Sequence, residues 1–188
     1  VEHKFGDISL RDTGPIILAD DGRRSARSFR FNGWGGKYEL EGDDTLAPRP
    51  PETIGLAAEP RDWILEGGAI DVDGTGLAVT TEQCLLNPNR NAGMDRTQIE
   101  ARLGADLGID RLLWLGEGLQ GDHTDGHVDN HARFVREGVL AVPVPESAAD
   151  PNSAAFGDAR YRAEAFGLEV VPLPSPGRLS SRSRLSSS

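Results

Sequence analysis

Apolar and polar residues alternate in three segments of the chain, and each segment contains a tight turn. Alternation with period two is typical of β-strands, and a turn containing Gly between two such runs is typical of a hairpin. The predicted hairpins begin about 55 to 60 residues apart, so the chain contains a repeated unit. They span Arg11–Asn32, Glu66–Thr80 and Asp125–Val142, with turns at Asp21-Gly22, Asp73-Gly74 and Glu137-Gly138.

A helix and a further strand are expected after the second and third hairpins. Ile99, Leu103 and Leu107 recur every four residues, which predicts a helix over 96–107. Asp95 is a suitable N-cap and Gly108 a suitable helix end. The remaining expected elements are a strand over 111–115, a helix over 154–165 ending at Gly167, and a strand over 168–173.

The repeated unit is therefore strand, strand, helix, strand, which predicts an α/β fold. Equal units of this kind form circular or stacked arrays in which neighbours bury each other's faces. The first unit has no such helix, and we expect its Pro-rich stretch 39–61 to be a long loop. The array is expected to occupy residues 1–174. The last 14 residues, 175–188, contain seven Ser and three Arg, which predicts a disordered low-complexity tail.

The amino-acid composition limits which kinds of binding partner and which cellular location the chain fits. The net charge of −10 disfavours nucleic acid and anionic membranes and favours a small cationic substrate. The single cysteine excludes an internal disulfide and a zinc cluster built from cysteines. The chain contains neither the roughly 18 consecutive apolar residues of a membrane helix nor an apolar signal core, so a cytoplasmic protein is expected.

Four residues that could carry chemistry lie at or near the start of the first strand in successive units: Asp12, Glu66, His127 and Asp129. In a closed array such equivalent positions converge on the axis. Two carboxylates can hold a planar guanidinium through paired N–H bonds. His127 and Asp129 are two residues apart, so they share one face if the segment is a strand, and a His-Asp pair can act in acid–base catalysis. A solvated strand face would show the same pattern.

The histidines, Cys84 and Trp34 each allow more than one interpretation. His123, His127 and His131 have a spacing that would line one face of a helix. On the strand we expect, His127 and His131 would be about 13 Å apart, so no metal site is predicted. Cys84 reads as a small buried hydrophobe rather than a nucleophile. Trp34 lies between glycines, where it either stacks on a planar cation or packs in a turn.

Five motifs, in this order and with these gaps, resemble the agmatine deiminase family, also called the Porphyromonas-type peptidyl-arginine deiminases. The resemblance covers roughly residues 5 to 178. The motifs are Leu-Arg-Asp-Thr-Gly-Pro at 10–15, Phe-Asn-Gly-Trp-Gly-Gly-Lys-Tyr at 31–38, Leu-Glu-Gly-Gly-Ala-Ile-Asp at 65–71, Cys-Leu-Leu-Asn-Pro-Asn-Arg-Asn at 84–91 and Thr-Asp-Gly-His-Val-Asp-Asn at 124–130.

The resemblance implies the pentein fold, an α/β propeller of five such modules. It also implies hydrolysis of agmatine to N-carbamoylputrescine and ammonia, a step of polyamine biosynthesis, through a covalent cysteine intermediate and without a cofactor. Carried over by motif, Asp12 and Asp129 would hold the guanidinium nitrogens. His127 would be the general acid/base, Glu66 would orient it, and Trp34 would shape the substrate pocket.

The chain departs from the family pattern in three respects. About three of the five modules are present, and the Gly-rich His-Cys segment that carries the family nucleophile is absent. Ser9 stands where Trp is usual. We therefore expect an incomplete deiminase chain that has no turnover by itself. Two alternatives remain: a related enzyme acting on peptidyl-arginine or methylated arginine, and a non-catalytic fragment that binds a cationic amine. Oligomeric state is left open.

Overall fold

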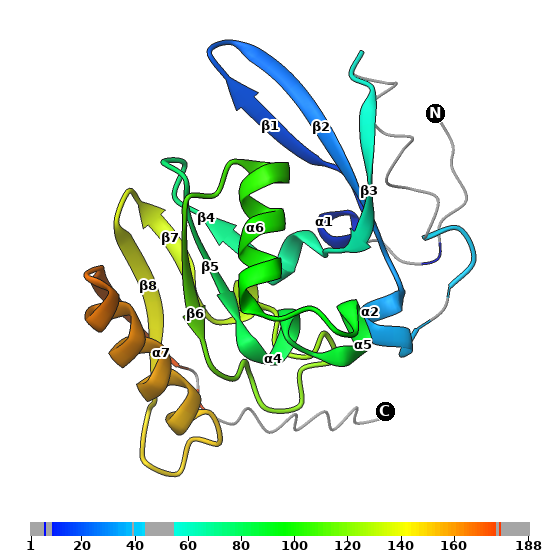
Figure 1. Cartoon of the computed structure of the whole chain (residues 1–188). Helices are drawn as coiled ribbons and strands as arrows, with labels where there is room; N and C mark the ends of the chain where they lie inside the picture. The colour runs from blue at the N-terminus through cyan, green and yellow to red at the C-terminus, as the bar shows by residue number, and fades with distance from the viewer. Residues whose placement is uncertain (1–5, 7–8, 39, 44–54, 176, 178–188) are drawn as a thin grey trace, which may run out of the picture.

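The computed structural model of the chain describes residues 6, 9–38, 40–43, 55–175 and 177. Three separate three-stranded sheets follow one another along the sequence, one for each predicted unit (Figure 1). The predicted tail over 175–188 lies outside the described residues, apart from Ser175 and Gly177. None of the described helices has the length and apolar character needed to cross a membrane.

Each sheet has the same topology, in which the middle strand pairs antiparallel with the strand before it and parallel with the strand after it. The first sheet consists of β1 (Ile16–Asp20), β2 (Arg23–Arg30) and β3 (Ala58–Ile64). The second consists of β4 (Ile70–Val72), β5 (Leu77–Thr81) and β6 (Arg111–Leu115), and the third of β7 (Arg133–Arg136), β8 (Val139–Val144) and β9 (Glu169–Pro174).

The second and third modules contain the predicted crossover helices, α6 (Arg96–Leu107) and α7 (Ser153–Phe166). Asp95 and Gln98 form a complete capping box at the start of α6, and Gly108 ends it in the left-handed conformation. The prediction of a strand-strand-helix-strand unit is therefore confirmed in these two modules. The remaining described helices are short: α1 (Leu10–Thr13), α2 (Gly33–Gly36), α4 (Glu82–Leu85), α5 (Pro88–Asn91), and the 3-10 turns η2 (Gly67–Ala69) and η3 (Val128–Asn130).

Two predictions about the strands were wrong. The loop expected over 39–61 ends earlier, because Ala58 already begins β3, which pairs with β2; residues 44–54 lie outside the described part. The strand expected over 127–135 begins only at Arg133, because residues 128–130 form η3. Gly67–Ala69 likewise form η2 before β4. A short turn therefore precedes the first strand of every module.

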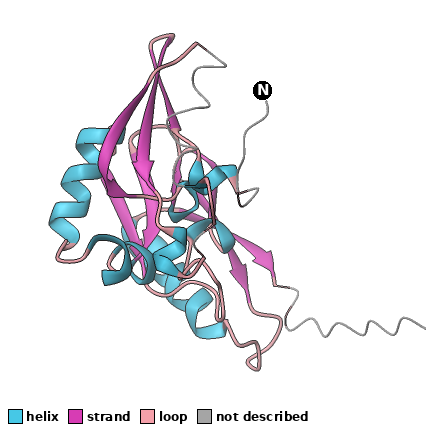
Figure 2. Ribbon diagram, turned by 90° about the vertical axis from the view of Figure 1, so that its right-hand side faces the viewer, coloured by secondary structure: helices cyan, strands magenta, loops and turns pink. Residues whose placement is uncertain are grey.

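The hydrophobic core is shared between modules. One cluster combines Phe29 and Trp63 of the first module with Ile99 and Leu103 of α6. In the second cluster, residues of β5 and β6 pack with residues of β8 and α7. α7 contacts β6 of the preceding module as well as β8 of its own, so each crossover helix joins two modules (Figure 1). Figure 2, turned by 90°, shows helices lying beside the strands. This packing fixes the starts of the three modules relative to one another.

Candidate active site

The three turns that begin the modules meet at one place. α1 contains Asp12, η2 follows Glu66 and contains Gly68, and η3 follows His127 and contains Asp129. η2 contacts both α1 and η3. The structure thus brings together the four residues that the sequence placed at equivalent module positions, although the strand face invoked for His127 and Asp129 does not exist.

Gly68 lies at the centre of this group. A Cβ atom added to it would lie 2.5 Å from His127 Nδ1, 2.8 Å from Asp12 Oδ1 and 2.9 Å from Asp129 Oδ2. The backbone N–H of Gly68 donates a hydrogen bond of 2.8 Å to Asp12 Oδ1. One nitrogen and two carboxylate oxygens therefore converge on a point where only glycine leaves room, which we call the Gly68 notch.

The two carboxylates beside the notch are largely withdrawn from water. Burial raises the pKa of Asp12, while the hydrogen bonds from Gly68 and Trp34 oppose this. Burial likewise raises the pKa of Asp129, opposed chiefly by Arg133, whose Nη2 lies 3.1 Å from Asp129 Oδ2. A planar cation between the two carboxylates would favour their ionised forms.

Trp34 supports one of these carboxylates. Its ring is 2% exposed, and its Nε1 donates a hydrogen bond of 3.1 Å to Asp12 Oδ2. The residue has a φ of 55°, a left-handed conformation that an L side chain adopts at a cost. Trp34 therefore lies buried against Asp12 and donates to its carboxylate, and its expected part in the substrate pocket stays a prediction.

His127 has its two ring nitrogens in different surroundings. Nδ1 faces the notch and lies 3.7 Å from Asp12 Oδ1. Nε2 is buried and has no hydrogen-bond partner among the described residues. Burial lowers the pKa of His127 to about 4, with the carboxylate of Asp129 acting in the opposite direction. Burial therefore favours the neutral form of the imidazole at pH 7.

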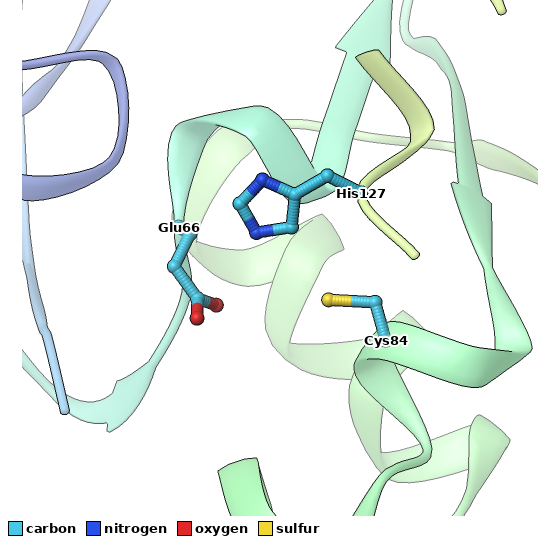
Figure 3. A group of neighbouring side chains, drawn as sticks. All are labelled: Glu66, Cys84 and His127. Atoms are coloured by element: carbon cyan, nitrogen blue, oxygen red, sulfur yellow. The ribbon is translucent and has the colours of Figure 1, made fainter. Parts of the chain in front are cut away.

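Glu66 and Cys84 both point toward the His127 ring, from the residue before η2 and from α4 (Figure 3). Glu66 is fully buried; its Oε1 accepts a hydrogen bond of 2.7 Å from Arg90 Nε, and its Oε2 has no partner among the described residues. Cys84 is fully buried in the core, as predicted. Burial raises the pKa of its thiol well above the usual value, so Cys84 carries a thiol rather than a nucleophilic thiolate.

The same three residues are the group in the described chain whose donor atoms could reach one metal ion, since these atoms lie within 4.8 Å of one another. The positively charged Arg90 already pairs with Glu66, and it would repel a metal ion bound at the same carboxylate. Metal binding also needs the thiolate of Cys84, which burial disfavours. The arrangement fits a neutral thiol beside an ion pair better than a metal centre.

Two important residues did not stand out as chemistry in the sequence. Gly68 was visible only as part of the motif at 65–71, which did not indicate that three side chains approach it. Arg90 was visible only as part of the motif at 84–91 and carried no predicted role. Its partner Glu66 is 24 residues away, so the ion pair follows from tertiary packing alone.

The buried histidines predict a defined pH dependence of stability. Burial lowers the pKa of both His127 and His131 to about 4, below the roughly 6.5 of an unfolded histidine. The stability that their neutral forms contribute is complete above about pH 6.5 and is lost as the pH falls toward about 4. We expect His131→Leu to reduce the decrease of the melting temperature between pH 7 and 4.5, measured by circular dichroism.

His123 provides the control, because its side chain is 60% exposed. The variant His123→Ala should retain the pH dependence of the unmodified chain. A melting temperature of His131→Leu that falls with pH as steeply as in the unmodified chain would contradict the assignment.

Comparison with known proteins shows the family of the chain. The model of the Porphyromonas-type peptidyl-arginine deiminase family matches residues 1–188. The agmatine deiminase of Stutzerimonas stutzeri is 40% identical over 192 residues, covering 94% of this chain and 52% of the relative. That of Pseudomonas fluorescens is 38% identical over 196 residues, covering 94% and 52%. The chain spans about half the length of the curated relatives it matches.

Solved structures show the same relationship. A cysteine-to-serine variant of C. jejuni agmatine deiminase with substrate bound matches with a TM-score of 0.88 and 33% identity, covering 96% of this chain and 55% of that one. The agmatine deiminase of Enterococcus faecalis matches with a TM-score of 0.84 and 33% identity, covering 91% and 50%. The fold expected from the resemblance is thus confirmed, and the chain belongs to the Porphyromonas-type peptidyl-arginine deiminase family.

Proposed function

We propose that the protein containing this chain hydrolyses agmatine to N-carbamoylputrescine and ammonia. In this proposal the 188 residues supply the guanidinium site and the general acid/base. The observation that carries it is the convergence of Asp12, Asp129 and His127 Nδ1 on the Gly68 notch. Support comes from relatives named agmatine deiminase that are 38 to 40% identical to this chain.

The notch has the chemistry needed to bind a guanidinium. Such a group is planar and positively charged, and it donates parallel N–H bonds to carboxylates. Asp12 and Asp129 contribute two such acceptors from different modules. Because burial raises the pKa of both carboxylates, a cation bound between them would favour their ionised forms.

The reaction requires a nucleophile in addition to these residues. A thiolate would attack the guanidinium carbon to form a C–S bond, and His127 Nδ1 would donate a proton to the departing ammonia. Water would then attack the same carbon, with His127 accepting its proton, and the C–S bond would break to release the ureido product. Cys84 is the single cysteine of the chain and is buried as a thiol, so we place the nucleophile outside these 188 residues.

Glu66 would act on His127 from the side away from the notch. The donation step needs the imidazolium, whereas burial favours the neutral ring. Transfer of the proton from the thiol of the nucleophile to His127, which forms a thiolate–imidazolium pair, would supply this proton. The negative charge of Glu66, within 4.8 Å of the ring nitrogen, would stabilise that form.

Agmatine is the substrate we favour, and the name of the family model motivates peptidyl-arginine as the second candidate. The net charge of −10 fits a small cationic substrate better than nucleic acid or an anionic membrane. We place the protein in the cytoplasm as part of this proposal.

The function is tested by assaying the full-length protein against agmatine, arginine and a benzoyl-arginine ester. We expect one ammonia and one N-carbamoylputrescine per agmatine consumed. His127→Ala should lower kcat on the order of 10²–10⁴-fold, the usual contribution of a general acid/base. The isolated 188-residue chain should bind agmatine without turnover. Faster conversion of the arginine ester, or ureido product from the isolated chain above a His127→Ala control, would contradict the proposal.

The notch itself is tested by Gly68→Ala. The new Cβ would lie within 3 Å of all three functional atoms, so we expect agmatine binding by calorimetry to weaken by on the order of 100-fold. Gly157→Ala is the matched control, because Gly157 lies within α7 and a Cβ there meets no atom within 4 Å. That control should bind agmatine normally. Equal affinities of the two variants would show that the guanidinium does not occupy the notch.

A further inference from the structure

We propose that Arg90 is a positioning residue of the active site, because its buried guanidinium forms an ion pair with Glu66 and anchors the loop that carries His127. Arg90 does not face the Gly68 notch and is not expected to touch substrate. The catalytic meaning of this assignment rests on the proposed function, whereas its electrostatic part can be tested independently.

Arg90 uses all three of its guanidinium nitrogens in the interior. Its side chain is 0% exposed. Nε donates to Glu66 Oε1 at 2.7 Å, Nη1 to Asp125 Oδ2 at 3.0 Å, and Nη2 to the Thr124 carbonyl at 2.7 Å. One side chain thus connects the residue before η2 with the residues that immediately precede His127.

The short helix α5 holds Arg90 in place. Asn87 caps it and Pro88 occupies its first turn. Asn91 forms two hydrogen bonds of 2.9 Å with the backbone of Ile64, at the end of β3 and two residues before Glu66. Helix α5, which contains Arg90, is therefore hydrogen-bonded to the segment that leads to Glu66.

The loop before His127 depends on the same contacts. Asp125 has a φ of 60°, and its carboxylate accepts hydrogen bonds from Arg90, from Asn89 Nδ2 at 2.9 Å and from Lys37 Nζ. A residue in the left-handed conformation is retained only where its surroundings fix it. Three donors on one carboxylate provide that restraint.

Charge explains why the partner of Glu66 must be a cation. The ionisable groups that face Glu66 are Arg90 from α5, Cys84 from α4, Asp12 from α1 and His127. Burial raises the pKa of Glu66, and Arg90 opposes this most strongly. Without Arg90, Glu66 would take up a proton, and a neutral Glu66 could not stabilise the imidazolium of His127.

The stability test compares Arg90→Met, Arg90→Lys and the double variant Arg90→Met/Glu66→Gln in the 188-residue chain. We expect Arg90→Met to lower the melting temperature at pH 7.5 by about 10 °C, because it leaves a buried carboxylate unpaired. Removing Arg90 raises the folded-state pKa of Glu66 further, so this loss should shrink as the pH falls toward 4.5. Glu66→Gln should restore the part of the loss that comes from the unpaired Glu66 carboxylate, and it should leave the part that comes from the lost bonds to Asp125 and Thr124. Arg90→Lys should lose less than Arg90→Met.

The same variants are then assayed in the full-length protein. We expect Arg90→Met to lower kcat about 10²-fold, with KM for agmatine changing by less than about threefold. The acidic limb of its kcat profile should move at least about one unit upward, because Glu66 then ionises at higher pH. In Arg90→Lys, the acidic limb of the pH profile of kcat should stay where it is in the unmodified enzyme.

A loss of melting temperature that is equal at pH 4.5 and 7.5 and is not recovered by Glu66→Gln would overturn the proposal, leaving Arg90 a purely structural residue. An unmoved acidic limb in Arg90→Met would overturn its catalytic part. An unmodified protein without deiminase activity would refute the proposed function, and the stability comparison would still decide the pairing of Arg90 with Glu66.

Discussion

The site depends on buried carboxylates that surround Gly68, a residue without a side chain. Asp12, Asp129 and the Nδ1 atom of His127 would all collide with a Cβ on Gly68. Buried carboxylates are costly unless a cation or hydrogen bonds compensate them. The protein compensates Glu66 with the buried Arg90 and Asp129 in part with Arg133, while Asp12 accepts hydrogen bonds from Gly68 and Trp34. In the proposed function, a guanidinium would complete this charge distribution, so binding and catalysis would depend on the same residues.

The module architecture creates this distribution. Each module begins with a short turn, and the crossover helices pack between neighbouring sheets, so the three turns are held together. Acidic or imidazole side chains placed on these turns converge without long loops. Two buried side chains hold carboxylates of the site in place. Arg90 donates a hydrogen bond to Glu66, and Trp34 donates one to Asp12. A substitution of Arg90 would therefore displace the carboxylate of Glu66 without removing a residue that contacts the ligand, and a substitution of Trp34 would displace that of Asp12.

Much of the arrangement could be predicted from the sequence. Helical periodicity and caps placed α6 correctly, and the spacing of the hairpins revealed the modules. The equivalent starts of the modules identified Asp12, Glu66, His127 and Asp129. The local geometry of the last pair was wrong, because Val128–Asn130 form a 3-10 turn despite their strand-like pattern. β3 was missed because Pro-rich sequence precedes it, and Arg90 because an ion pair between residues 66 and 90 leaves no periodic signal.

The most direct measurement is a crystal structure of the full-length protein with agmatine, carrying a substitution of its nucleophile to prevent turnover. The account predicts the guanidinium carbon above Gly68, with N–H groups donating to Asp12 and Asp129 and with His127 Nδ1 within hydrogen-bond distance of one nitrogen. A guanidinium that contacts neither carboxylate, or that lies away from Gly68, would contradict the account.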